Sequence, residues 1–161
     1  MEPQFMEFFR ALMPEDPQNR WLFEYDGEPF SVFVEKLQDQ KQGKQLPKGW
    51  VPASTFYLIR EDGKILGKSS FRHELNDFLK TIGGNIGYII RPDQRQKGYG
   101  AAILKLTLEK ARELGLERVV VTCDEDNIAS AKIIERSGGV FEDPCRKDET
   151  AVLKRRYWIT L

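Results

Sequence analysis

Two kinds of hydrophobic pattern divide the 161-residue chain near residue 53. Before this boundary, apolar residues recur at the spacing of a helix, which predicts helices over Met6–Met13 and Ser31–Gln42. The residues expected to form their buried stripes are Phe5, Phe8, Phe9 and Leu12, then Val32, Val34 and Leu37. Trp21, Phe23 and Phe30 lie between the two helices in sequence and are expected to pack under the domain.

After this boundary, runs of β-branched and aromatic residues predict strands. Thr55–Arg60 and Ile65–Phe71 flank the tripeptide Glu61–Gly63, whose Asp-Gly pair favours a tight hairpin turn. A short helix over Glu74–Thr81 then leads to a third strand over Asn85–Arg91. We therefore expect these three strands to form an antiparallel meander.

The last third of the chain alternates helices and strands. A helix after residue 100 would bury a stripe formed by Ile103, Leu104, Leu106, Leu108, Ala111 and Leu114. Glu117–Cys123, with three consecutive valines, predicts a buried parallel strand. Ile128–Ser137 predicts a second helix, and Val140–Phe141 and Ala151–Thr160 predict two closing strands. This order of elements predicts a mixed-sheet α/β or α+β domain.

Composition and charge narrow the function. The chain has 25 Lys plus Arg and 25 Asp plus Glu, so no global field attracts nucleic acid or a membrane surface. No apolar run approaches the roughly 20 residues of a membrane helix. Cys123 and Cys145 form no CxxC pair, and a single histidine cannot complete a Cys/His zinc site. We expect one domain over 1–161, reduced thiols, no metal, no signal peptide and a cytoplasmic location.

One stretch carries candidate chemistry: RQKGYG, Arg95 to Gly100, between a predicted strand and a predicted helix. The first turn of a helix leaves N–H groups unpaired and carries the positive end of its dipole. Most helices cap these donors with Ser, Thr, Asp or Asn, but residues 97–101 include none of these types. The glycines permit close backbone approach, and Arg95 and Lys97 add positive charge. The stretch therefore predicts a site for a phosphate-sized anion.

The glycine spacing separates the candidate ligands. A Walker loop requires GxxxxGK[ST], which is absent, and a dinucleotide fingerprint requires a third glycine where Ile103 stands. ATP and NAD are therefore not expected. The spacing Arg95-x-x-Gly98-x-Gly100 instead matches [QR]-x-x-G-x-[GA], the pyrophosphate-binding motif of the GNAT superfamily of acetyl-CoA-dependent N-acetyltransferases.

The surrounding elements follow the order of that superfamily. The strand end Ile90-x-Pro92-x-x-Arg95 resembles its "V-x-P-x-x-R", and a later helix opens at Asn127 and closes at Gly138–Gly139. The chain resembles a GNAT domain over residues 53–160, with 1–52 as a helical N-terminal part. The segment from Phe71 to Pro92 also resembles a subgroup of predicted acetyltransferases.

The resemblance implies a GNAT fold, in which helices flank a mixed central sheet with an antiparallel N-terminal meander, and acetyl-CoA as co-substrate. Backbone N–H groups of six consecutive residues, flanked by Arg95, would hold the pyrophosphate: Gln96, Lys97, Gly98, Tyr99, Gly100 and Ala101. The strand end through Ile89 and Ile90 would pair with the pantetheine arm. Asn127, with Ser130 nearby, would also meet the pantetheine, and a plain N-cap role for Asn127 stays open.

The catalytic positions depart from the family pattern. The family's frequent general acid, a Tyr seven residues after the Asn, is Ile134 here, and Asn85 lies nearest to the position of its frequent Glu base. The remaining candidates are Tyr88 on the third strand, and His73 and Glu74 at the end of the second. Three further residues could line the acceptor site or only pack: Cys123, Tyr157 and Trp158.

The leading hypothesis is an N-acetyltransferase that moves an acetyl group directly from acetyl-CoA to a primary amine of a small molecule or peptide. The missing Tyr and Glu suggest an alternative, a catalytically silent acyl-CoA-binding sensor or interaction domain. A nucleic-acid or phosphoprotein binder using Arg91, Arg95 and Lys97 is disfavoured, because the net charge is zero and no extended basic face is evident. The expected partners are acetyl-CoA, an unidentified amine and a second copy of the chain in a homodimer.

Overall fold

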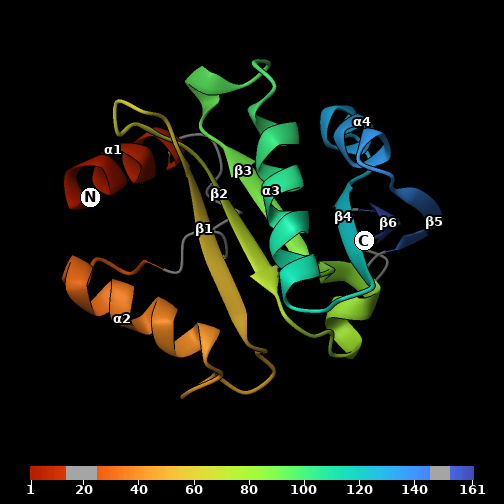
Figure 1. The fold of residues 1–161 in the computed structure, drawn as a ribbon, viewed down its shortest axis with the longest axis horizontal. Helices are drawn as coiled ribbons and strands as arrows, with labels where there is room; N and C mark the ends of the chain where they lie inside the picture. Colours follow the sequence, from red (N-terminus) through yellow and green to blue (C-terminus); the bar gives the residue numbers. More distant parts are fainter. Residues whose placement is uncertain (14–24, 146–152) are drawn as a thin grey trace.

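A six-stranded mixed sheet runs through the molecule (Figure 1). The computed structural model describes residues 1–13, 25–145 and 153–161, so the expected packing of Trp21 and Phe23 lies outside the described residues. The strands are β1 (Ala53–Ile59), β2 (Ile65–Arg72), β3 (Ile86–Ile90), β4 (Arg118–Asp124), β5 (Val140–Cys145) and β6 (Lys154–Thr160). Their order is β1-β2-β3-β4-β6-β5, and β3 and β4 are parallel while the other neighbours are antiparallel. The predicted mixed sheet with an N-terminal meander is confirmed.

Helices cover both faces of this sheet (Figure 1). They are α1 (Glu2–Leu12), α2 (Phe30–Lys41), α3 (Tyr99–Glu113) and α4 (Ile128–Arg136). On one face, side chains of α3 and α4 pack with Phe71, Ile86 and Val121 of the sheet. On the other, Phe5, Phe8, Leu12 and Phe33 of α1 and α2 pack with Ile65 and Ile89. Burial of these two apolar layers is the main favourable term in the fold.

Alternation along β2 assigns its side chains to these two faces. Ser69 faces α3, because its hydroxyl oxygen lies 2.9 Å from that of Thr107, within hydrogen-bond distance. Successive side chains of a strand point to opposite faces, so Ser70 and Arg72 point away from α3. Gly87 pairs with Ser70 and lies on that same opposite face. The face opposite α3 therefore gathers polar positions of β2 beside β3.

Two predicted helical stripes differ from the observed ones. Val32 is 49% exposed, because α2 turns Phe33 toward the aromatic cluster of α1 instead. In α3, Leu106 is 48% exposed, since it lies roughly 130° around the helix from the centre of the buried stripe. Thr107 takes the buried position and bonds the carbonyl oxygen of Ile103 at 2.8 Å.

The helix predicted over Glu74–Thr81 begins only at residue 77 and continues as a π-helical turn, labelled η2, over Leu79–Gly83. The Gly84 N–H donates to the Leu79 carbonyl at 2.7 Å, which closes the wider i→i−5 ring. Gly84 has a φ of +64°, and an added Cβ would lie 2.6 Å from the Val120 carbonyl oxygen. This close approach, together with a 2.8 Å bond from the Thr122 hydroxyl to the Ile82 carbonyl, fixes the turn against β4.

Cys123 and Cys145 are both free and buried. Among the described residues, no helix is long and apolar enough to cross a membrane. Over the same residues, no group of three or more His, Cys, Asp or Glu side chains is placed to hold a metal ion.

Candidate functional site

The two parallel strands β3 and β4 meet at one end and diverge at the other. Their register contains a single pair, Ile86 with Val121, whereas β4 pairs with β6 along its whole length from Arg118 to Asp124. Beyond Ile86, β3 continues to Ile90 without a partner on the β4 side, so a gap opens between the strands (Figure 1).

Asn85 closes the narrow end of this gap. Its backbone N–H donates to the Val120 carbonyl at 2.7 Å, and its side-chain oxygen accepts from the Val120 N–H at 2.8 Å. Its side-chain nitrogen donates to the Arg72 carbonyl at 3.1 Å, and the residue is only 2% exposed. The Asn85 side-chain amide has no ionisable proton, and its oxygen and nitrogen are both hydrogen-bonded, so it joins β2, β3 and β4. This geometry favours a structural role over the predicted catalytic one.

The backbone of β3 presents alternate residues to the gap. The Arg91 N–H donates to Leu66 of β2, and the Asn85 carbonyl accepts from Arg72 of β2. In an antiparallel pair every second residue bonds the same neighbour, so Ile89, which lies between them in this series, also faces β2. Tyr88 and Ile90 therefore direct their N–H and C=O groups toward β4, where no strand pairs with them.

The open end of the gap leads to the first turn of α3. A 3₁₀ turn, η3 (Pro92–Gln94), carries the chain from β3 to Arg95, and α3 begins at Tyr99 with Gly98 as its N-cap. No side chain caps this helix, as the sequence predicts. Its first donors therefore point out of the helix end together with the positive end of the dipole.

The two glycines of the motif serve different purposes. Gly98 has a φ of +83° and open space around its missing side chain, so its backbone is accessible to a ligand. Gly100 has ordinary φ, but a Cβ there would lie 2.8 Å from Ile133 of α4 and 3.8 Å from the Tyr88 ring. Gly98 thus shapes the helix end, while Gly100 allows α3 to approach α4 and β3.

The cations of the motif also brace the loop that carries them. Arg95 Nε donates to the Ile90 carbonyl at 3.2 Å, and Lys97 Nζ donates to the Asp93 carbonyl at 3.0 Å. Arg91 is buried and bonds Glu7 of α1 and Asp93 at 3.0 and 2.6 Å, so it ties the loop to α1. Arg95 and Lys97 therefore keep positive charge close to the helix end, whereas Arg91 is held away in an ion pair.

Tyr88 and Ser130 meet beside the gap. The two hydroxyl oxygens are 2.8 Å apart, and burial raises the pKa of Tyr88 to about 12. Ser130 lies in the first turn of α4, and its N–H donates to the side-chain oxygen of Asn127 at 3.0 Å. The N-cap role of Asn127 is therefore present, and its side-chain nitrogen is the group that a ligand would have to use.

His73 and Glu74 do not line the cavity described below, as far as the described residues extend. His73 Nε2 lies 2.8 Å from the Ser54 hydroxyl, and its ring packs on Phe71 at 5.4 Å between ring centroids. Burial lowers the pKa of His73, the charge of Lys41 lowers it further, and Glu74 opposes both effects. A neutral, packed histidine fits a structural role here.

The other candidates pack rather than line an opening. Ile134 and Tyr157 are fully buried in the core under α3 and α4, and the Tyr157 hydroxyl donates to Glu135 at 3.1 Å. Trp158 donates to Glu142 at 2.7 Å. Burial raises the pKa of the Cys123 thiol to about 11, which leaves it an uncharged, unreactive group at neutral pH.

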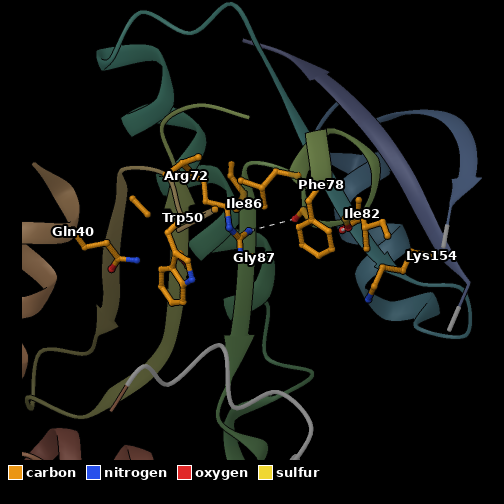
Figure 2. Close-up of a pocket in the computed structure, with 15 residues that line it drawn as sticks. Gln40, Trp50, Arg72, Phe78, Ile82, Ile86, Gly87 and Lys154 are labelled. Carbon is orange, nitrogen blue, oxygen red and sulfur yellow. Dashed lines mark hydrogen bonds between the residues drawn. The ribbon is translucent and has the colours of Figure 1, made fainter. Parts of the chain in front are cut away.

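A cavity of about 440 Å³ lies on the face opposite α3 (Figure 2). Gly87 of β3 and Thr122 of β4 both line it, so it adjoins the gap between these strands. Its other walls include Trp50, Arg72, Phe78 and Lys154, none of which the sequence analysis predicted. Of these four residues, Trp50 is the one whose place in the sequence could have suggested a binding site, because it is a large aromatic residue in the proline- and glycine-containing connector Leu46–Pro52. Arg72 and Lys154 look like ordinary strand residues in the sequence.

The model of the acetyltransferase (GNAT) domain matches residues 1–140. The chain belongs to the GNAT acetyltransferase family. The match begins at residue 1, so it includes α1 and α2, whereas the sequence motifs placed the resemblance in residues 53–160.

Individual relatives of this GNAT domain are distant. The chain is 25% identical over 111 residues to the N-acetyltransferase YnaD of Bacillus subtilis, whose own function is uncharacterised. The alignment covers 68% of this chain and 62% of YnaD, so the chain spans less than two thirds of that relative.

Solved structures share the fold. A Bordetella pertussis protein assigned to the GNAT family matches with a TM-score of 0.66 at 16% identity, over 99% of this chain and 91% of that one. The Salmonella typhimurium protein YncA, solved with its cofactor acetyl-CoA, matches with a TM-score of 0.59 at 16% identity, over 86% of this chain and 76% of that one.

Proposed function

We propose that this GNAT domain binds acetyl-CoA and transfers the acetyl group directly to a primary amine of a small molecule or peptide. One observation carries the proposal: the gap between β3 and β4 runs from an uncapped helix end at Gly98 to a cavity on the opposite face. The helix end suits the anionic part of a long thioester co-substrate, and the cavity suits a separate acceptor.

The pyrophosphate would lie on the first turn of α3. Backbone N–H groups from Gln96 to Ala101 would donate to its oxygens, as helix N-termini do for phosphates. Arg95 and Lys97 would add positive charge from the side of the loop. The Salmonella protein of the same fold was solved with acetyl-CoA, which supports the choice of co-substrate.

The pantetheine arm would lie along β3 inside the gap. Tyr88 and Ile90 offer backbone groups there, so we assign the pairing to these two residues and not to Ile89, whose side chain packs in the cluster under α1 and α2. On the α4 side, the side-chain nitrogen of Asn127 and the hydroxyl of Ser130 would contact the arm.

The transfer forms one bond and breaks another. The amine nitrogen attacks the thioester carbonyl, a C–N bond forms, the C–S bond breaks, and the proton released by the nitrogen goes to the sulfur, directly or through water. A backbone N–H of β3 in the gap would stabilise the oxyanion. A lysine-like amine has a pKa of about 10.4, so only its neutral fraction reacts near neutral pH.

Tyr88 would donate a hydrogen bond toward the sulfur rather than give up its proton. With a pKa raised to about 12 by burial, its hydroxyl remains protonated throughout the physiological range. A thiolate with a pKa of about 8.5 is too weak a base to take that proton. Tyr88 thus stabilises the leaving group while the substrate amine supplies the proton.

A catalytically silent acyl-CoA-binding domain remains the second candidate. Ile134, at the family's Tyr position, is fully buried, and the Asn85 amide is occupied by backbone groups. Neither can carry a proton, and this observation favours the silent alternative.

Two measurements test the proposal. At a hundredfold excess over its dissociation constant, CoA should stabilise the fold by about 2.7 kcal/mol, which raises the melting temperature by roughly 5–10 °C. Release of free thiol from acetyl-CoA across a panel of amines then separates the two candidates. No melting shift would overturn the coenzyme assignment, and binding without turnover on the whole panel would favour the silent domain.

A further inference from the structure

Two large aromatic side chains in the walls of the cavity are poorly covered by the rest of the protein. Trp50 is 49% exposed and Phe78 is 55% exposed, and both line the cavity. In Figure 2 their rings lie on opposite sides of Gly87. The apolar surface is extended by Leu79, Ile82 and Ile86. Single exposed apolar side chains are common on a protein surface, but a group of them at a concave site is typical of a surface that buries the apolar part of a ligand.

Asn76 ties together the two segments that carry these aromatic residues. Its side-chain nitrogen donates to the carbonyl of Gly49, the neighbour of Trp50, at 2.8 Å. Its side-chain oxygen accepts from the N–H of Leu79, the neighbour of Phe78, at 2.9 Å. The fold therefore sets both aromatic walls in position before a ligand binds, which lowers the entropy cost of binding.

Two hydroxyl-bearing residues flank Gly87 on the floor of the cavity. Ser70 pairs with Gly87 across β2 and β3, and Ser70 and Thr122 both line the cavity. Gly87 and Thr122 each follow a member of the single residue pair that joins β3 to β4, so they lie where the gap begins. The Thr122 hydroxyl donates its proton to the Ile82 carbonyl at 2.8 Å, which leaves its oxygen to accept a hydrogen bond. An accepting oxygen at this point suits the N–H of an amine.

We infer that the acceptor carries an aromatic or comparably bulky apolar group in addition to its amine, as an arylalkylamine does. The apolar group packs between Trp50 and Phe78, and the amine lies beside Gly87 and the Thr122 hydroxyl, where the cavity meets the gap. This substrate class rests on the proposed acetyl transfer. It follows from the exposed apolar surface and its fixed position, and not from the charge of the cavity walls.

Binding of a matched product pair tests this substrate class without requiring turnover. Calorimetry on the CoA-saturated protein compares N-acetylphenethylamine with N-ethylacetamide, which has the same amide and ethyl chain but lacks the phenyl ring. N-acetylphenethylamine should bind at least about tenfold more tightly, as expected when a phenyl ring is buried against apolar walls. A smaller preference, or no binding of N-acetylphenethylamine at about 10 mM, would overturn the inference.

Variants locate the preference for the ring. The double variant Trp50→Ala/Phe78→Ala removes both aromatic walls, so the affinities of the two ligands should come to within about threefold of each other. Phe141→Ala is the matched control, because Phe141 is 51% exposed on β5 and does not line the cavity. It should leave the preference unchanged.

CoA affinity, measured in each variant, shows that the variant is folded. Where the double variant does not bind CoA, the single variants Trp50→Ala and Phe78→Ala should each reduce the preference by at least about twofold. A preference that persists without these rings, or that is lost in Phe141→Ala, would refute the assignment to these two walls.

The CoA titration that precedes this experiment separates the two proposals. If CoA does not bind to the unchanged protein, the proposed function fails and the substrate class fails with it. If CoA binds and N-ethylacetamide binds as well as N-acetylphenethylamine, only the substrate class fails.

Discussion

The two ends of the gap between β3 and β4 use backbone donors in opposite ways. At the narrow end, the Asn85 amide and the Val120 backbone satisfy each other and leave no donor for a ligand. At the wide end, α3 begins at Gly98 with no capping side chain, so the fold leaves its first donors without an acceptor. Backbone donors that are hydrogen-bonded within the fold stabilise it, whereas donors without a partner are available to a ligand.

The two helices beside the gap repeat this contrast. Asn127 accepts from the Ser130 N–H and caps α4, whereas Gly98 has no side chain with which to cap α3. Both helices begin close to the same gap, but only α3 retains its full set of open donors. We therefore place the proposed anion site at α3, with side chains contributed from α4.

The largest expected effect is on CoA binding at the wide end. Gly98→Glu places a carboxylate where the pyrophosphate is proposed to lie, and like charges about 4 Å apart near a surface cost about 4 kcal/mol, roughly a thousandfold in affinity. Isothermal titration calorimetry with CoA measures this loss of affinity.

Gly115→Glu is the matched control for that variant. Gly115 has a φ of +79° and open space, as Gly98 does, but lies at the opposite end of α3. It should bind CoA like the unchanged protein, and equal loss in both variants would mean that backbone strain, not charge, causes the effect.

At the narrow end the expected loss is in stability. Asn85→Ala leaves the buried Val120 N–H and Arg72 carbonyl without partners, which costs about 2–4 kcal/mol and lowers the melting temperature by roughly 5–15 °C. Asn76 also bonds two backbone groups, Gly49 and Leu79, but is only half-buried. Asn76→Ala should therefore cost less, about 1 kcal/mol, and the reverse order would contradict the role given to Asn85.

A smaller effect, on rate, is expected at Tyr88. Tyr88→Phe removes the hydroxyl that would stabilise the leaving sulfur, so kcat should fall about tenfold while CoA affinity stays nearly unchanged. The rate should rise with pH in both proteins as the amine loses its proton, because Tyr88, with a pKa of about 12, does not titrate in that range. A pH dependence that disappears in Tyr88→Phe would instead identify Tyr88 as a proton carrier.

Tyr88 also has a consequence for stability at high pH. Its pKa is raised to about 12 in the folded state from the ordinary 10.0, so the unfolded chain ionises first. The stability that it contributes is complete below pH 10 and is lost as the pH rises toward 12. Urea unfolding across this range should show a steeper decline in the unchanged protein than in Tyr88→Phe.

The smallest expected effect is at the cap of α4. Asn127→Ala removes one capping bond and should cost about 1 kcal/mol of unfolding free energy. CoA affinity should fall by far less than in Gly98→Glu, because only one side-chain contact to the pantetheine is lost. A loss of affinity as large as that of Gly98→Glu would place the anion at α4 instead.

Local chemistry explains why parts of this fold could be predicted. Asp62-Gly63 specifies its own hairpin turn, and the uncapped start of α3 follows directly from the residue types around Gly98. The π-helical turn at Leu79–Gly83 could not be read in this way, since it depends on the approach of Gly84 to Val120 of β4.

The cavity on the face opposite α3 shows the limit of sequence reasoning more clearly. Arg72, Gly87, Thr122 and Lys154 come from four different strands, and only the strand order β2-β3-β4-β6 brings them to one cavity. The sequence also does not determine which face of a helix is buried when neighbouring residues are both apolar. In α2, Phe33 takes the core position that Val32 was expected to fill. Periodicity identifies the helices, but tertiary packing selects the buried face.

The most direct test of the account is the response of individual backbone amides to CoA, measured in ¹⁵N–¹H spectra of the labelled protein. On saturation, the amide signals from Gly98 to Ala101 should shift, while those of Asn85 and Val120, already bonded inside the fold, should keep their chemical shifts. Bound CoA that leaves the Gly98–Ala101 amides unchanged would contradict the claim that the uncapped end of α3 is the anion site.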